Sequence, residues 1–184
     1  HLVRIICFED NSAMKWKKIN EEVLFPSRDQ HVVAVSKTTI DYIKEIASEN
    51  SRQRSRLCCH KTIEEGVQEM VIFHPKGTYV PAHKHHNREE SIHIIEGELD
   101  LITFDDIGSI KSILRMSEYL SGYEFYSRIP ASVYHAQVFV RDTIFHEVTK
   151  GPFVKQDNVI ASWTPVTSNV MNVEEYASLI DVNK

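Results

Sequence analysis

Between residues 67 and 149 the chain consists of short runs rich in apolar, β-branched and aromatic residues, separated by residues typical of turns. Runs of this length and composition favour strands, and the glycine, proline, serine and aspartate residues between them favour tight connections. The pattern predicts strands over residues 67–73, 78–85, 91–95, 98–104, 110–116, 123–129, 133–140 and 143–149. Short strands at this regular spacing indicate an all-β sandwich or barrel.

Helical patterns occur on either side of these strands. Ile40, Ile43, Ile46 and Ala47 recur at helical spacing after a capping signal at Ser36 or Thr38, which predicts a helix packed on the outside of a sheet. A short helix is expected over residues 173–180, and residues 31–35 are rich in β-forming residues. We therefore divide the chain into an N-terminal extension with one helix (1–51), a barrel (52–150) and a tail that packs on the barrel (151–184).

Composition and charge narrow the class of protein. The chain has 184 residues, of which 42% are hydrophobic and 26% charged, values typical of one soluble globular domain. A net charge of −5 without a basic block argues against nucleic acid as a partner. No apolar run is long enough to span a membrane, and the first ten residues lack the features of a signal peptide.

The cysteines indicate a reducing compartment. Cys7, Cys58 and Cys59 cannot all pair, and the adjacent Cys58 and Cys59 point to opposite sides of an extended chain. A cytoplasmic location is the simplest expectation.

Histidines and glutamates are concentrated in the stretch between Gly77 and Gly97. His83, His85, Glu89 and Glu90 lie within eight residues, and imidazole nitrogens with carboxylate oxygens suit a divalent transition metal. In an extended chain His83 and His85 point to the same face, so both rings can reach one ion. The alternative is a cluster of polar side chains on the rim of the fold.

The same stretch resembles the first motif of the cupin superfamily, G-x5-H-x-H-x3,4-E-x6-G. Pro130 to His135 resembles the second motif, P-x-G-x2-H, with Ser132 in place of the glycine. The resemblance implies a double-stranded β-helix, the cupin jelly-roll barrel, and one divalent metal ion (Fe, Mn, Ni, Co or Zn). It implies four metal ligands, which are His83, His85, Glu90 and His135.

More narrowly, the chain is similar to WbuC-type cupin-fold metalloproteins of bacterial O-antigen biosynthesis. The similarity includes the segment RSRLCCH at residues 54–60 and shorter matches at 67–70, 104–108, 151–153 and 163–165. It implies a sugar-like small molecule as partner. The sequence leaves the oligomeric state open, although cupins commonly dimerise and the apolar edge strands would allow a homodimer.

Several acidic residues and histidines compete for the role of ligand. Glu89 is the rival of Glu90, but only Glu90 stands six residues before Gly97 as the motif requires. If Glu90 faces the interior, then His93 has the opposite parity and faces out. The remaining histidines, which are His1, His31, His74, His86 and His146, are assigned no role.

Arginines alternate along the segment before the first barrel strand. Arg52, Arg54, Arg56, Cys58 and His60 share one face if this segment is extended. Guanidinium groups bind phosphate and carboxylate well, so Arg54, Arg56 and His60 are candidates for holding an anionic substrate. The alternative is a solvated edge strand whose charges discourage aggregation.

The remaining candidates are a carboxylate and a set of aromatic rings. Glu147 lies on the last predicted strand and is a candidate general base or an orienter of a ligand, unless it simply faces solvent. Six aromatic residues either form the wall of a substrate pocket or belong to the core, and they are Tyr79, Tyr123, Phe125, Tyr126, Tyr134 and Phe139. Of these, Tyr134 is the predicted substrate contact.

Three functions are compatible with these residues. The first is an isomerase-like or epimerase-like enzyme that acts on a sugar or sugar-nucleotide in surface-polysaccharide synthesis, where a metal polarises a carbonyl. The second is an Fe(II)-dependent dioxygenase. The third is a non-catalytic carbohydrate-binding or regulatory module, which predicts ligand binding without turnover.

Overall fold

The computed structural model describes residues 16–27, 30–167 and 170–182. Its elements in chain order are β1 (Trp16–Lys18), β2 (Val23–Pro26), α1 (Lys37–Ser48), β3 (Ser55–Cys58), β4 (Val67–His74), β5 (Tyr79–His85), β6 (Glu90–Glu96), β7 (Glu98–Phe104), β8 (Ile110–Ser117), β9 (Tyr126–Ile129), β10 (Tyr134–Phe139), β11 (Thr143–Lys150), β12 (Asn158–Ile160) and α2 (Val173–Val182). Two short 3-10 helices, η2 (Tyr119–Ser121) and η3 (Lys155–Asp157), lie in connections. His1 and Cys7 are outside the described residues.

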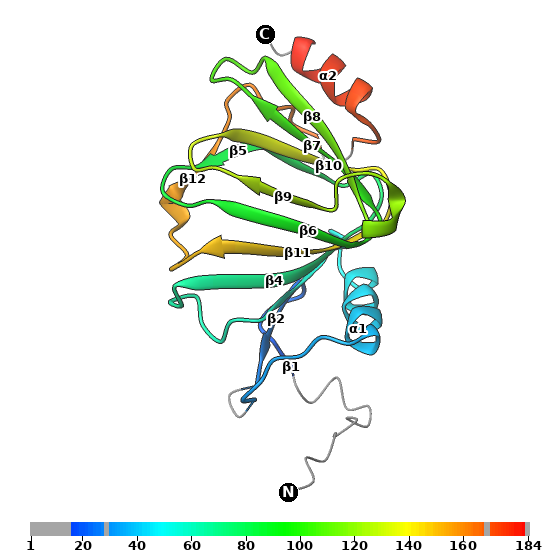
Figure 1. Ribbon diagram of the computed structural model, residues 1–184, viewed down its shortest axis with the longest axis vertical. Coiled ribbons are helices and arrows are strands. Elements are labelled where there is room, and N and C mark those ends of the chain that lie inside the picture. The colour runs from blue at the N-terminus through cyan, green and yellow to red at the C-terminus, as the bar shows by residue number, and fades with distance from the viewer. Residues whose placement is uncertain (1–15, 28–29, 168–169, 183–184) are drawn as a thin grey trace, which may run out of the picture.

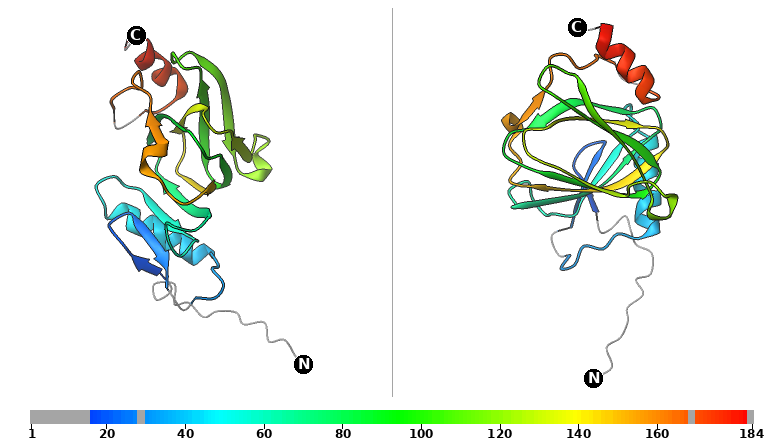
Figure 2. Two further views of the ribbon diagram at one scale, coloured as in Figure 1. Left: turned by 90° about the vertical axis from the view of Figure 1, so that its left-hand side faces the viewer. Right: turned by 45° about the horizontal axis from the view of Figure 1, so that its top comes forward.

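The strands form two sheets that curve around a common interior (Figures 1 and 2). One sheet has the order β1-β2-β3-β4-β11-β6-β9, and the other has the order β12-β5-β10-β7-β8. From β4 to β11, successive strands lie in opposite sheets, except that β7 and β8 form a hairpin within one sheet, and this is the strand order of a jelly roll. The prediction of an all-β, double-stranded β-helix with an N-terminal helix is therefore confirmed.

Apolar side chains fill one half of the space between the sheets. Ile94 of β6, Leu99 of β7, Met116 of β8 and Phe139 of β10 are all at most 1% exposed and belong to one cluster. Each comes from a different strand, because alternation sends every second side chain into the interior. This packed half supports the other half, which is polar.

The helices cover the outer faces of the sheets. Ser36 caps α1 in a capping box with Thr39, and the helix buries Ile43 and Ile46 against the sheet that contains β3 and β4. At the other end of the molecule the tail and α2 cover β7 and β10, where Tyr176 is fully buried. Among the described residues, no helix is long and apolar enough to cross a membrane.

Within the described residues before α1, the structure differs from the expectation. Residues 31–35 form no strand, whereas β1 and β2 form a hairpin that extends the sheet beyond β3. Because β3 pairs with β2 on one side and with β4 on the other, it is not an edge strand. The interpretation of the arginine segment as a solvated edge strand is therefore wrong.

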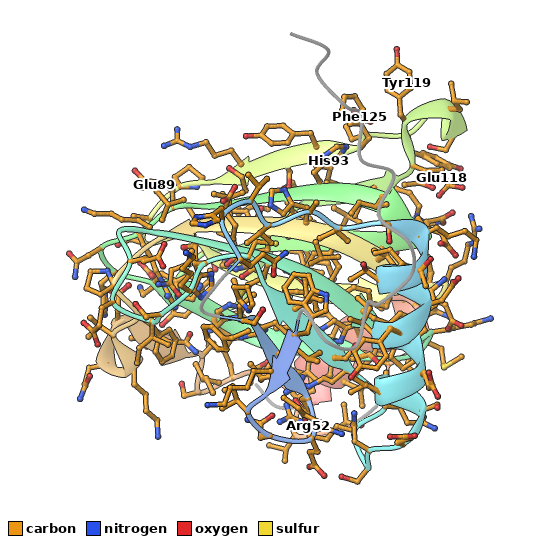
Figure 3. All side chains as sticks on the ribbon, turned by 90° about the horizontal axis from the view of Figure 1, so that it is seen from below. Arg52, Glu89, His93, Glu118, Tyr119 and Phe125 are labelled. Atoms are coloured by element: carbon orange, nitrogen blue, oxygen red, sulfur yellow. The ribbon has the colours of Figure 1, made fainter. Side chains whose placement is uncertain are left out.

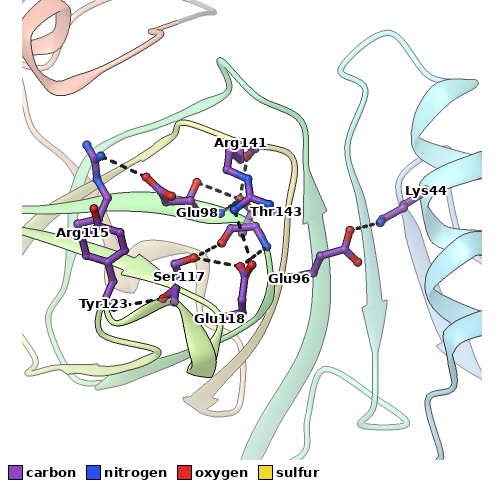
Figure 4. Close-up of polar contacts among 11 residues, drawn as sticks. Lys44, Glu96, Glu98, Arg115, Ser117, Glu118, Tyr123, Arg141 and Thr143 are labelled. Atoms are coloured by element: carbon purple, nitrogen blue, oxygen red, sulfur yellow. Dashed lines mark hydrogen bonds and ion pairs between the residues drawn. The ribbon is translucent and has the colours of Figure 1, made fainter.

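Gly97 occupies the turn between β6 and β7, where a polar network surrounds it (Figure 4). Its N–H donates to Glu118 Oε2 at 3.1 Å, and its carbonyl accepts from Ser117 Oγ at 2.8 Å. Its φ is +100°, and a Cβ at this position would collide with the backbone of Asp142 and Thr143. Only glycine fits, which is a physical reason for the last glycine of the first motif.

Candidate metal centre and its cavity

Three strands bring His83, His85, Glu90 and His135 together inside the barrel. The two histidines of β5 face the interior, Glu90 is the first residue of β6, and His135 of β10 pairs directly with His83. One ligand atom from each of the four residues lies within 4.8 Å of the others. The buried group could therefore hold one metal ion.

Hydrogen bonds fix the orientation of two of these rings. Nδ1 of His83 donates to the carbonyl of Pro81 at 2.8 Å, and Nδ1 of His135 donates to the carbonyl of Val133 at 3.0 Å. Each ring therefore keeps the unprotonated Nε2 that a metal needs. His135 Nε2 is buried and has no hydrogen-bond partner in the described part of the chain. A bound metal would satisfy this atom, so the residues fit the ion that the motif implies.

A β-bulge in β5 aims these histidines inward. His135 pairs with His83 and Gln137 with Val80, so three steps along β5 match two along β10. The extra residue reverses the alternation, which lets both Val80 and His83 face the interior while Tyr79 packs outside. Pro81 lies at the bulge, where a missing N–H breaks no ladder bond.

The protonation states of the cluster suit metal binding. Burial alone would raise the pKa of Glu90, but the hydrogen bond from His85 at 3.2 Å and the nearby rings lower it. Burial and the neighbouring His135 lower the pKa of His83 to about 4. A carboxylate and neutral imidazoles are the forms that bind a metal.

The rival ligands lie elsewhere. The Glu89 side chain is 45% exposed and pairs with Arg128 at 3.4 Å, whereas Glu90 is 5% exposed. His93 lies on the outer surface, where its ring contacts Phe125 (Figure 3). The placement of Glu89 agrees with the spacing of the motif, and that of His93 agrees with the parity argument.

Ser132 takes the place of the glycine in the second motif. Its φ is +65°, which is the left-handed region that glycine adopts freely and serine adopts at a cost. Its N–H donates to the carbonyl of His85 at 2.7 Å, so this conformation ties the start of β10 to the end of β5. The chain keeps the geometry of the motif without its glycine.

The cluster borders a cavity of about 620 Å³ between the two sheets. Arg54, Arg56 and His60, the candidates for holding an anionic substrate, line it together with Arg52 and Cys58. His60 is fixed by the N–H of Glu69, which donates to its Nδ1 at 3.1 Å, and burial lowers the pKa of His60. The alternating segment therefore faces the cavity.

Glu147 also lines the cavity, where it is half-buried. It pairs with Met70 and Ile92 on the neighbouring strands, and Thr149 pairs with Glu90, so Glu147 is the diagonal neighbour of Glu90. Burial raises its pKa, and the negative charge of Glu90 raises it further. The Glu147 carboxyl is therefore a poor acid compared with an exposed glutamate.

The predicted aromatic wall is wrong. Tyr134 has the opposite parity to its neighbour His135, so its ring lies outside the cavity, under Lys84 Nζ at 4.1 Å and against Trp163. The other five aromatic residues proposed for the wall do not line the cavity either. Its aromatic residues are instead Phe25, Phe145 and Phe153.

Sequence reasoning missed two residues near the cluster. Gln137 shares its strand face with His135 and approaches Glu90 at 3.4 Å, which alternation could have revealed. Arg88 is 8% exposed, donates to His85 Nδ1 at 3.1 Å and lies 3.5 Å from Asp157 Oδ2. With Nδ1 accepting, the proton of His85 is on Nε2, where a bound metal would replace it.

Comparisons with known proteins assign no function to this chain. A family described as a domain of unknown function, DUF6016, matches residues 35–116, which is less than half of the chain. No protein of curated function matches the sequence.

Solved structures with a similar fold share little sequence with this chain. KdgF from Halomonas sp. has 12% identity and a TM-score of 0.44, covering 56% of this chain and 83% of its own. A cupin-superfamily sugar phosphate isomerase from Silicibacter pomeroyi has 16% identity and a TM-score of 0.39, covering 47% and 52%. The capsular polysaccharide assembling protein CapF from Staphylococcus aureus has 18% identity and a TM-score of 0.46, covering 58% and 29%. Similarity at this level carries no information about substrate or reaction.

Proposed function

We propose that this protein is a metal-dependent cupin enzyme that binds an anionic, sugar-like small molecule and moves a proton on it, as an isomerase or epimerase does. One observation supports this proposal above the others. A buried group of three histidines and one glutamate borders a cavity whose walls carry arginines and a carboxyl group of raised pKa. Perturbed titratable groups in a cavity are typical of catalytic sites.

The metal site is the first part of the proposal. His83, His85, Glu90 and His135 would hold a divalent ion, and the unpaired Nε2 of His135 supports this assignment. When bound, the ion supplies Lewis-acid polarisation of a substrate oxygen. Iron, manganese, nickel, cobalt and zinc all accept this donor set.

Glu147 is the proposed acid and base. In an isomerisation one proton leaves a carbon and one proton returns, so the enzyme needs a group that both gives and takes a proton near neutral pH. The raised pKa of Glu147 gives it this property, and its position diagonal to Glu90 keeps it beside the metal site.

Arg56 is the proposed anchor for the anionic group of the substrate. It lines the cavity and has no ion pair within the described ranges, whereas Arg52 and Arg54 both pair with Glu22. Its charge acts on Glu147, His60 and His74, which places it among the cavity groups. An unpaired guanidinium is a ready partner for a carboxylate or phosphate.

The resemblance of residues 54–60 to WbuC-type proteins supports a role in surface-polysaccharide synthesis, which we include in the proposal. We also propose that residues 52–150 form the catalytic unit, with the segments before and after it as supports.

Elemental analysis tests the metal site. Protein purified without added metal is expected to carry about one equivalent of a transition metal, and His85→Ala and His135→Ala are expected to lose it. His93→Ala is the matched control, because His93 is exposed on the outer face. Metal content that is unaffected by both ligand variants would refute the assignment.

Isotope exchange tests the reaction. The protein is incubated in D₂O with a panel of sugar acids and sugar phosphates, and deuterium incorporation at carbon is followed by NMR. Glu147→Gln is expected to abolish incorporation while keeping the metal. Binding without exchange in the wild type would favour a non-catalytic module, and O₂ uptake would favour a dioxygenase.

A further inference from the structure

Glu22 lies between two arginines that line the cavity. One carboxylate oxygen is 3.2 Å from Arg52 Nε, and the other accepts a hydrogen bond from Arg54 Nε at 3.2 Å. The Glu22 side chain is only 15% exposed and that of Arg54 only 26%. Two guanidinium groups thus already share one carboxylate, which leaves this trio a net charge of +1.

The backbone places Glu22 there. Its N–H donates to Asn20 Oδ1 at 2.9 Å in the turn between β1 and β2, and its carbonyl accepts from the N–H of Arg56 at 2.7 Å. Hydrogen bonds to both the N–H and the carbonyl of Glu22 therefore fix the conformation of the turn. Figure 3 shows Arg52 beside this hairpin.

Arg56 differs from its two neighbours in the same segment. It lies within β3, paired with Ile72, whereas Arg52 and Arg54 precede the strand. Its charge acts on Glu147, while neither Arg52 nor Arg54 does so to a resolvable extent. Among the arginines of this segment, the described contacts leave only Arg56 without an ion pair.

We infer that Glu22 restricts the substrate to molecules with a single anionic group, which Arg56 binds. This inference rests on the proposed function. A second anionic group, such as the diphosphate of a nucleotide sugar, would have to displace Glu22 from Arg52 and Arg54 or bear its repulsion. Glu22 is thus a specificity-determining residue that favours a simple sugar acid or sugar monophosphate over a nucleotide sugar.

Calorimetric titration of the metal-loaded protein with four probes tests this inference. D-glucuronate and D-glucose 6-phosphate carry one anionic group each, as carboxylate or phosphate, UDP-glucose carries a diphosphate, and D-glucose is neutral. The wild type is expected to bind a singly anionic probe more tightly than UDP-glucose. Glu22→Gln is expected to raise the affinity for UDP-glucose about tenfold and to change that for the singly anionic probes less than about twofold.

Glu21→Gln is the matched control, because Glu21 is an exposed neighbour on the same hairpin and its substitution removes the same charge. It is expected to leave all affinities unchanged, and Glu22→Ala is expected to reproduce Glu22→Gln. An equal gain in Glu21→Gln would overturn the inference, since net charge alone would then explain the effect.

Arginine variants separate this inference from the proposed function. If Arg56→Ala loses the singly anionic probes but Glu22→Gln changes nothing, the inference fails and the anion anchor stands. If the wild type binds UDP-glucose tightly and Arg52→Ala or Arg54→Ala loses it, Glu22 is only a displaceable counterion and the inference fails. If no probe binds the wild type, both proposals fail.

Discussion

Replacing His74 with phenylalanine is expected to make the protein less sensitive to acid. His74 ends β4, is 5% exposed, and stacks on Phe139 with ring centroids 4.5 Å apart. Its Nδ1 is buried without a hydrogen-bond partner among the described residues. Burial, with the positive charges of Arg56 and Arg52, lowers the pKa of His74 from its ordinary value of 6.5 to about 3.

The sign of the effect follows from this lowered pKa. The unfolded chain takes up a proton at His74 as the pH falls through 6.5, whereas the folded chain does so only near 3. The destabilising effect of His74 is therefore absent above pH 6.5 and grows progressively between pH 6.5 and pH 3. At pH 5 the difference is about 1.5 pH units, or about 2 kcal/mol.

Urea unfolding at pH 7.5 and pH 5.0, with chelator present at both values, measures this contribution. The wild type is expected to lose about 2 kcal/mol more than His74→Phe between the two values. His93→Gln is the control, because it removes a histidine that is exposed on the outer face, and it is expected to behave as the wild type. Equal losses in the wild type and in His74→Phe would show that His74 is not buried in its neutral form.

Three further variants or conditions test the local geometry. Ser132→Gly is expected to raise the free energy of unfolding by about 0.5–1 kcal/mol, since relief of the left-handed conformation outweighs the entropy that glycine adds to the unfolded chain; a decrease on denaturation would contradict this. Gly97→Ala is expected to lower the free energy of unfolding by about 2 kcal/mol or more, because the new Cβ collides with the backbone of Asp142 and Thr143. An unchanged melting temperature would refute this explanation. Chelation is expected to lower the melting temperature of the wild type but not that of His135→Ala, which has already lost a ligand. A metal that binds only the folded chain stabilises it by about 2.7 kcal/mol when the free metal is at a hundredfold excess over its Kd. Equal shifts in the two proteins would place the metal elsewhere.

The sequence predicts the strands well because alternation and turn residues are local signals. Every strand from β4 to β11 was expected close to its observed bounds, although β9 begins three residues later than predicted. The hairpin of β1 and β2 was not expected, since it is short and depends on pairing with β3, a contact between distant segments. The ion pairs of Glu22 depend on the same long-range pairing, so no local pattern reveals them.

The residues of the candidate metal cluster could be predicted because the spacing of a sequence motif identifies them. The residues around the cluster could be predicted less well, and each error has a physical cause. Tyr134 is adjacent in sequence to the candidate ligand His135, and adjacent residues of a strand face opposite ways, so its ring lies outside the cavity. Arg88 lies in a loop between β5 and β6, where no periodicity predicts the direction of a side chain.

Tyr79 shows how one backbone irregularity changes the chemistry of the whole cavity. Strict alternation along β5 would place Tyr79 on the same face as His83 and His85, and a phenol would then enter the polar half of the barrel. The bulge at Pro81 reverses the parity, so Val80 enters instead and Tyr79 packs against Tyr176 under the C-terminal helix. The carbonyl of Pro81 also receives the Nδ1 proton of His83. The bulge thus both excludes a competing hydroxyl from the cavity and leaves His83 Nε2 free to bind a metal, two effects that a regular strand could not combine.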